Sequence, residues 1–233
     1  MERKIGVVGG MGPMASQLFY KMVTEMTEAG CDQEHLNMVI ISDSSMPDRT
    51  RAILDGDGEE VCRKLRGDLQ LLRQCGCEAA CITCNTAHYF ADLVERDVDI
   101  PIIHMIKETA KKIAEENPGG KVAVLATDGT IKTGLYQKRL AEAGVLPYVP
   151  TAETQRQVMY QIYDRIKSGK TWDQASWRRI EEEVKAAGCC RAIMACTELS
   201  VIKADNDLPD FYVDPMTVLA EKAIAFAGKK VKR

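Results

Sequence analysis

Short apolar runs alternate with longer amphipathic stretches along the chain, and this alternation restricts the fold more than any other feature of the sequence. Residues 4–8 (KIGVV), 37–42 and 78–83 are short and mostly apolar, as buried strands are. Residues 14–29 and 58–74 carry apolar side chains at intervals of three or four positions, which predicts helices. Strands that alternate with helices in this way indicate an α/β protein with mostly parallel sheets.

The alternation occurs in two similar series. KIGVVGGMGP, which begins at Lys4, is similar to KVAVLATDGT, which begins 117 positions later at Lys121. CITCNTAH around Cys84 is likewise similar to AIMACTELS around Cys196, 112 positions later. Because two motifs recur at nearly the same interval, we predict two similar domains, each a mostly parallel sheet flanked by helices. A pseudo-two-fold axis would relate them, with the active site between them. A chance likeness of ordinary strand–turn–helix patterns is the alternative.

The end of the second series sets the predicted domain boundaries. We predict a first α/β domain of residues 1–103 plus 208–233 and a second α/β domain of residues 104–207. In this division the last strand, at 211–213, and the last helix, at 215–227, return to the first domain. Further helices are predicted from the spacing of apolar residues at 86–95, 106–116, 133–143, 153–168 and 171–187.

Charge and hydropathy exclude several classes of protein. The chain has 31 Lys and Arg against 34 Asp and Glu, a net charge of −3, and so lacks the basic balance expected of a nucleic-acid partner. No apolar run approaches the roughly 18 residues of a membrane span. The apolar run that follows Met1 is shorter than the core of a signal peptide, so we expect a cytoplasmic protein with no membrane partner. In a cytoplasmic protein, nine cysteines indicate free thiols, a metal site or catalysis.

Cys84 and Cys196 hold equivalent places in the two series, each where a strand ends and a helix begins. Ligands bind at this edge of parallel sheets, and the positive end of a helix dipole favours the thiolate. If the domains face each other, the two thiols approach one cleft from opposite sides. Such a pair suits racemisation, because one thiolate removes the α-proton and the other thiol returns a proton to the opposite face. The alternative is that both cysteines are small buried core residues.

Two cations are candidate ligands for a substrate carboxylate. Arg49 follows the second predicted strand, in a loop at the same sheet edge as Cys84, and a guanidinium binds a carboxylate through two hydrogen bonds. Lys167 ends a predicted helix just before Gly169. The alternatives are a surface arginine and a lysine that only meets the helix dipole.

The glycine-rich turn after the first strand indicates a different ligand. Gly10–Ala15 fits the G-x-G-x-x-A fingerprint of dinucleotide-binding folds. However, Asp43 lies 31 residues beyond Gly12, which is far for a ribose-binding acid, and Pro13 lacks an N–H for a pyrophosphate. We therefore disfavour a nucleotide-binding oxidoreductase, and expect the glycines to let the backbone approach a small carboxylate.

Four cysteines lie close together in the sequence. Cys75, Cys77, Cys81 and Cys84 resemble a zinc or iron–sulfur site in spacing, but Cys81 and Cys84 would point to opposite faces of one strand, so we predict no metal. His88, four residues after Cys84, either tunes its thiol or is a structural histidine.

Six blocks of the sequence, in order along the chain, resemble the cofactor-independent aspartate/glutamate racemase family: GVVGGMGPMAS, SSMPDRT, CNTAH, LATDGT, IKSG and ACTEL. The resemblance runs from Lys4 to about Pro215, and the two cysteine-bearing blocks are its most specific part. Glu198 stands where the glutamate racemases usually carry His, which places the chain nearer the aspartate racemases. Ala195 departs from the family, in which Gly commonly precedes the second cysteine, and its methyl group could narrow the approach to Cys196.

The resemblance implies a role for each candidate site residue. It implies Cys84 and Cys196 as the catalytic acid/bases, with Cys84 acting on the D-enantiomer and Cys196 on the L-enantiomer. The residues that it implies around the α-carboxylate and ammonium are Asn85, Thr86, Thr127 and Thr197. Those on the side-chain carboxylate are Arg49 and Lys167, and Met11, Ala87 and Glu198 complete the substrate-binding set. The resemblance implies a homodimer with no metal and no cofactor.

We therefore predict an isomerase, a racemase independent of pyridoxal phosphate that interconverts L- and D-aspartate, with glutamate as a second candidate substrate. One alternative is an isomerase or decarboxylase of a dicarboxylic acid on the same scaffold. Another is a protein that binds an amino acid without turning it over, although binding alone does not need two thiols.

Overall fold

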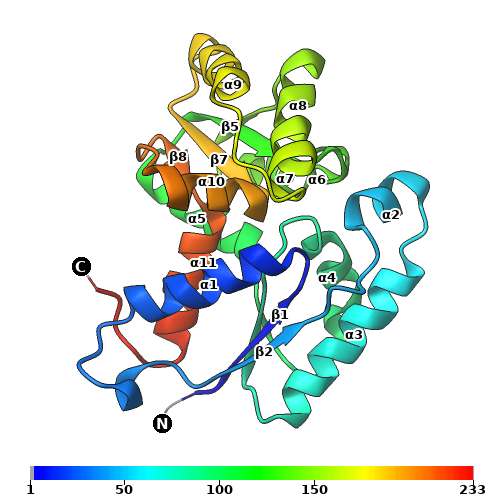
Figure 1. The fold of residues 1–233 in the computed structure, drawn as a ribbon, viewed down its shortest axis with the longest axis vertical. Coiled ribbons are helices and arrows are strands. Elements are labelled where there is room, and N and C mark those ends of the chain that lie inside the picture. The colour runs from blue at the N-terminus through cyan, green and yellow to red at the C-terminus, as the bar shows by residue number, and fades with distance from the viewer. Residues whose placement is uncertain (1–2, 233) are drawn as a thin grey trace.

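The computed structural model describes residues 3–232 and contains two parallel four-stranded sheets (Figure 1). The first sheet has the order β2-β1-β3-β4, with strands β1 (Ile5–Gly9), β2 (Met38–Ser42), β3 (Ala79–Ile82) and β4 (Ile102–Ile103). The second has the order β6-β5-β7-β8, with strands β5 (Lys121–Ala126), β6 (Leu146–Tyr148), β7 (Arg191–Ala195) and β8 (Tyr212–Val213). All the paired strands run parallel. The repeated order confirms the two similar α/β domains predicted from the recurring motifs.

Helices flank both sheets. Those of the first half are α1 (Pro13–Met26), α2 (Arg49–Asp55), α3 (Glu59–Gln74), α4 (His88–Val94) and α5 (Met105–Glu116). Those of the second half are α6 (Asp128–Thr133), α7 (Leu135–Glu142), α8 (Ala152–Met159), α9 (Gln174–Ala186), α10 (Thr197–Asn206) and α11 (Pro215–Phe226). A π-helical segment, Tyr160–Ile166, continues α8, and two short 3₁₀ segments lie at Asp32–Glu34 and Glu95–Asp97.

Each sheet is buried on both faces, as parallel sheets are. One face of the first sheet packs against α3 and α4 through a cluster that includes Leu65, Leu69 and Phe90. Its other face packs against α1 and α11, which contribute Phe19 and Leu219. The second sheet is likewise covered by α8, α9 and α10 on one face and by α5 and α7 on the other.

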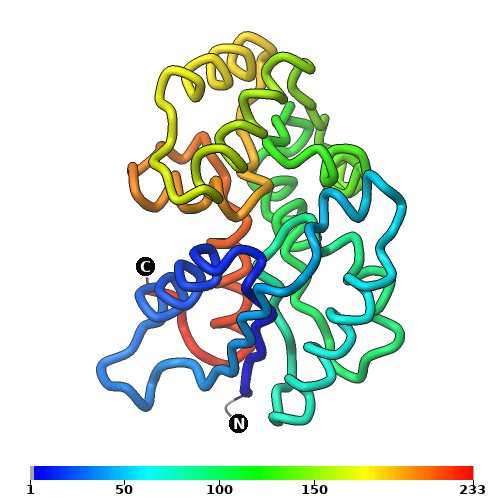
Figure 2. Tube along the Cα trace, turned by 45° about the vertical axis from the view of Figure 1, so that its right-hand side comes forward, coloured from blue at the N-terminus to red at the C-terminus, as the bar shows by residue number. Residues whose placement is uncertain are grey.

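The last helix of each half covers the sheet of the other half. Helix α5 follows β4 of the first sheet but buries Ile106 and Ile113 against the second. Helix α11 follows β8 of the second sheet but packs on the first, beside α1 (Figures 1 and 2). Strand β8 itself pairs with β7, so the prediction that the last strand returns to the first domain is wrong. A two-residue strand has no periodicity that could reveal its partner in the sequence.

The helices differ from the predicted ones in detail. Arg49 begins helix α2, where we expected a loop, because the Asp48 side chain accepts the Arg51 N–H and caps the helix. The helix predicted at 133–143 is α7. The short helix α6 before it was not predicted, and Gly134, with φ of +67°, separates the two. The helix predicted at 153–168 is α-helical only as far as Met159.

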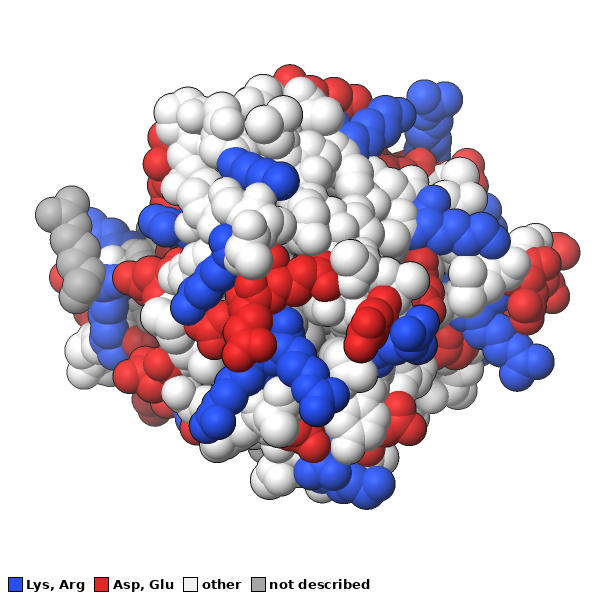
Figure 3. Space-filling model, turned by 90° about the horizontal axis from the view of Figure 1, so that it is seen from above, with Lys and Arg blue, Asp and Glu red and all other residues white. Residues whose placement is uncertain are grey.

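The surface carries charges of both signs. Figure 3 shows basic and acidic side chains interspersed over the face seen from above in Figure 1, beside uncharged areas. Among the helices of residues 3–232, none is both long and apolar enough to cross a bilayer.

Candidate active site

A cavity between the two domains brings the predicted site residues together. The residues that line it from the first domain are Met11, Asp48, Arg49, Thr50, Cys84, Asn85 and Thr86. Those from the second domain are Thr127, Tyr163, Lys167, Cys196, Thr197 and Glu198. Of the predicted set, Ala87 lies outside this lining, buried at the N-cap of α4. Asp48, Thr50 and Tyr163 were not predicted. Asp48 and Thr50 flank Arg49 in the sequence, which is the signal that could have found them.

Arg49 is held beside Cys84 by backbone carbonyls. Its Nη1 donates to the carbonyls of Met46 and Pro47, and its Nη2 donates to that of Met11 at 3.2 Å. The buried Nε has no hydrogen-bond partner in the part of the chain that the structure describes. Burial alone would lower the pKa of Arg49, but the neighbouring Cys84 sulfur and two carboxylates raise it on balance. The guanidinium is therefore charged and rigid, and its Nε–H is left for a ligand.

The turn after β1 places the Met11 carbonyl that Arg49 contacts. Gly10 has φ of +86°, and a Cβ there would lie 2.5 Å from the backbone of Asp43. The glycine at this position thus lets the turn approach the end of β2.

Cys196 lies in the opposite electrostatic setting. It is the N-cap of α10, and its Sγ donates to Oε2 of the buried Glu198 at 2.9 Å. Burial raises the pKa of the Cys196 thiol well above its usual range, and the carboxylate of Glu198 raises it further against the opposing charge of Lys167. The helix N-terminus argument, which predicted a favoured thiolate at Cys196, is therefore overturned by burial and by Glu198.

Lys167 reaches across the cavity to the first domain. Its Nζ lies 3.8 Å from Oδ2 of Asp48 and 4.1 Å from the centre of the Tyr163 ring. The Tyr163 hydroxyl donates to the same Asp48 oxygen at 3.2 Å. Burial would lower the pKa of Lys167, but the charge of Glu198 and its other neighbours raise it, so the amine is cationic. Asp48, Tyr163 and Lys167 together close one side of the cavity.

On another side of the cavity, threonine hydroxyl groups from the two domains contact each other. Thr86 Oγ1 lies 3.0 Å from Thr127 Oγ1 and 2.9 Å from Thr130 Oγ1. Thr127 also caps α6 by accepting the Thr130 N–H. Thr86 thus contacts the second domain and does not cap the helix that follows it.

His88 holds the backbone of Cys84 and not its thiol. Its Nε2 accepts the Met105 N–H at 3.2 Å, so Nδ1 carries the proton and donates to the Cys84 carbonyl at 2.9 Å. Burial and the nearby His104 lower the pKa of His88 to about 3, so the ring is neutral. These contacts favour a structural role for His88 over tuning of the Cys84 thiol.

The lining side chains nearly fill the cavity in this conformation. Its volume is about 10 Å³. That is room for about one water. Helix α2 packs on α6 across the mouth, and a Cβ on Gly129 would lie 2.8 Å from Cα of Thr50. An amino acid therefore enters only when the domains separate.

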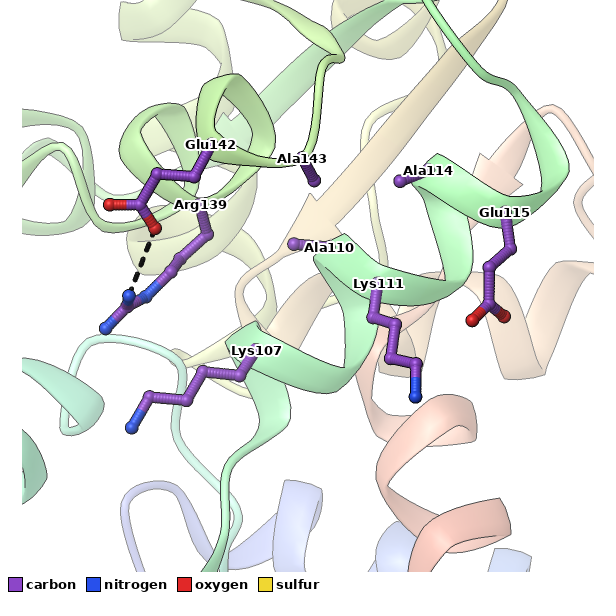
Figure 4. Close-up of a pocket in the computed structure, with 8 residues that line it drawn as sticks. All are labelled: Lys107, Ala110, Lys111, Ala114, Glu115, Arg139, Glu142 and Ala143. Carbon is purple, nitrogen blue, oxygen red and sulfur yellow. Dashed lines mark hydrogen bonds and ion pairs between the residues drawn. The ribbon is translucent and has the colours of Figure 1, made fainter.

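A second hollow, between α5 and α7, lacks the features of a reaction site (Figure 4). It is open and lined by alanines and the stems of charged side chains. Arg139 is paired with Glu142, and Lys107 lies near Asp92 and Glu95. Within residues 3–232, no group of three or more His, Cys, Asp or Glu side chains is placed to hold a metal ion.

Comparison with known proteins agrees with this geometry. The family model described as Asp/Glu/Hydantoin racemase matches residues 8–223. The chain belongs to this racemase family. Its relatives in the family are isomerases that act on amino acids, and so this chain is an amino-acid isomerase.

Two racemases resemble the chain over nearly its whole length. It is 27% identical over 229 residues to the broad specificity amino-acid racemase RacX of Bacillus subtilis, covering 95% of this chain and 96% of RacX. The structure of an aspartate racemase from Picrophilus torridus superimposes with a TM-score of 0.83 at 27% identity, covering 99% of this chain and 96% of that chain. Glutamate racemase from Aquifex pyrophilus shares the fold, with a TM-score of 0.64 at 19% identity over 96% of this chain and 83% of that one.

Proposed function

We propose that this family member is an aspartate racemase that uses Cys84 and Cys196 as its two acid/bases and needs no cofactor. The observation that carries the proposal is that two thiols from equivalent points of the two domains line one cavity. Racemisation requires proton transfer on both faces of the α-carbon, and each domain offers one sulfur. The name of the Picrophilus torridus protein supports aspartate, whereas that of RacX points to a wider range of amino acids.

The two cysteine sulfurs remove and return the α-proton, so the reaction needs no other acid or base. When the Cys84 thiolate acts as base, the Cα–H bond breaks, an S–H bond forms on Cys84, and the electron pair moves into the α-carboxylate. The Cys196 thiol then gives its proton to the opposite face of the α-carbon and becomes the thiolate. For the other enantiomer the roles are exchanged. We assign Cys84 to the D-enantiomer and Cys196 to the L-enantiomer.

The charged groups of the cavity suit a substrate with a second carboxylate. Arg49 has its buried Nε free for an acceptor, and Lys167 is charged. We propose that these two cations bind the side-chain carboxylate, displacing Lys167 from Asp48. Asn85, Thr86, Thr127 and Thr197 then surround the α-carboxylate and ammonium, where donors stabilise the enolate-like intermediate. The homodimer and the cytoplasmic location remain predictions.

The test is incubation of the pure reduced protein with L-aspartate, and separately L-glutamate, in D2O without pyridoxal phosphate. Chiral chromatography with mass spectrometry should find D-aspartate carrying α-deuterium, formed faster than D-glutamate. Cys84→Ser and Cys196→Ser should each abolish the conversion. Turnover that survives either substitution would exclude the two-thiol mechanism. Binding of aspartate without α-proton exchange would favour the amino-acid-binding alternative.

A further inference from the structure

A buried tyrosine of the second domain reaches the cavity wall of the first. Tyr136 lies on α7 in the core of the second domain, fully buried among residues such as Val124 and Ile193. Its hydroxyl donates to Oδ1 of Asn85 at 2.5 Å. Burial raises the pKa of Tyr136 well above its usual range, so the hydroxyl keeps its proton and acts as a donor. Tyr136 itself lies behind the residues that line the cavity.

This hydrogen bond determines which way the Asn85 amide faces. An asparagine offers an accepting oxygen and a donating nitrogen. Since Oδ1 is taken by Tyr136, Nδ2 is the end left over, and it is buried without a hydrogen-bond partner among the described residues. Asn85 follows Cys84 directly and lines the same cavity. A buried donor without a partner is costly, and an anion in the cavity would satisfy it.

The neighbouring contacts hold the same segment from the same side. Thr86 is bound by the hydroxyls of Thr127 and Thr130 on α6, and Gly134 joins α6 directly to α7. Asn85 and Thr86 are therefore both fixed by one helix pair of the second domain, next to the Cys84 sulfur.

We infer that Tyr136 is a positioning residue of the active site, whose hydroxyl fixes the Asn85 amide so that Nδ2 donates to the substrate's α-carboxylate. The inference rests on the proposed function, because it takes the ligand to be an amino acid. Tyr136 acts through Asn85 and touches no reacting atom. Without its hydroxyl, the amide is free to turn its oxygen toward the carboxylate, which repels it.

The experiment is a double-mutant cycle of Tyr136→Phe and Asn85→Ala, with kcat and KM for L-aspartate measured for each variant. We expect Tyr136→Phe to raise KM about tenfold, the loss expected for one hydrogen bond to a charged group. Asn85→Ala should raise KM at least as much. In the Asn85→Ala background, Tyr136→Phe should change KM no further, because the group through which it acts is gone. Tyr212→Phe is the matched control, since Tyr212 is buried in the other core of the second domain. It should leave both constants unchanged.

The outcomes separate this inference from the proposed function. If the parent protein does not turn over aspartate, the proposed function fails, and calorimetric titration with L-aspartate replaces KM in the same cycle. An unchanged affinity in Tyr136→Phe, or an equal loss in the Asn85→Ala background, would overturn the role of Tyr136. If Tyr136→Phe does not fold, Asn85→Asp serves instead: it keeps the acceptor for Tyr136 but removes the N–H. Parent-like affinity in Asn85→Asp would contradict the inference.

Discussion

The two cysteines of the cavity have opposite neighbours, and this difference determines where a negative charge is stable. The Arg49 guanidinium lies against Cys84, whereas the Glu198 carboxylate accepts the proton of Cys196 in a hydrogen bond. Cys196 therefore holds its proton more firmly than a free thiol does. The free protein would begin a cycle with Cys196 as the acid.

Glu198→Gln should make Cys196 easier to ionise. The substitution keeps the size of the side chain but removes the charge that raises the Cys196 pKa, so the pKa should fall toward its usual value. Each unit of the fall increases the thiolate fraction below the pKa about tenfold. The measurement is the rate of Cys196 alkylation by iodoacetamide against pH, followed by mass spectrometry in a Cys84→Ser background. Asp48→Asn removes another cavity carboxylate and should move the midpoint less. A midpoint that is unchanged or higher in Glu198→Gln would contradict the assignment.

The cysteine pair could be predicted from the sequence, but its electrostatics could not. Cys84 lies two residues after the end of β3 and Cys196 one residue after the end of β7, and ligands bind beside this edge of parallel sheets. The turn of α10 then folds Glu198 back onto the Cys196 sulfur, a contact that depends on side-chain rotamers and burial. Tyr136 was missed for a similar reason, because its partner Asn85 lies 51 positions away in the other domain.

Helix α2 is the element that connects the first domain to the mouth of the cavity. It carries Arg49 and Thr50, and it packs so closely on α6 that only a glycine fits at 129. The position of Arg49 near Cys84 could be predicted from the sequence, but we expected a loop around it instead of a helix. Seven residues give too few turns for an apolar periodicity, and the local signals were the two caps, Asp48 before the helix and Gly56 after it.

Gly129→Ala should lower activity through α2. The new methyl group would lie 2.8 Å from Cα of Thr50, so α2 and the adjacent Arg49 must shift. Displacement of a substrate-binding group by about 1 Å can cost a hundredfold, and we expect kcat/KM to fall by about ten- to a hundredfold. The control is Gly67→Ala in α3, where the methyl group meets open space. It should stabilise the protein by about 0.5–1 kcal/mol and leave kcat/KM unchanged. Equal kinetics for both variants would refute the role of α2.

Helices α5 and α11 each cover the sheet of the other domain, and we call this arrangement the exchange of the two helices. Because of it, the stability of each domain depends on the other. Each sheet is covered on one face by a helix that follows the other sheet's last strand. If either domain unfolded alone, it would pull this helix away and expose the apolar face beneath it. These two helices therefore tie the two cores together.

The two domains should therefore unfold in one transition. Trp172 and Trp177 are the two tryptophans of the chain and lie in the second domain, so their fluorescence reports that domain. Cys81, fully buried on β3, reports the first through its reactivity with a thiol reagent. In urea, the fluorescence change and the labelling of Cys81, resolved by mass spectrometry, should have the same midpoint, as a two-state transition requires. Cys77, also buried in the first domain, should become reactive together with Cys81. Labelling of both cysteines while the fluorescence is still native would mean that the first domain unfolds alone, and that the exchanged helices do not couple the cores.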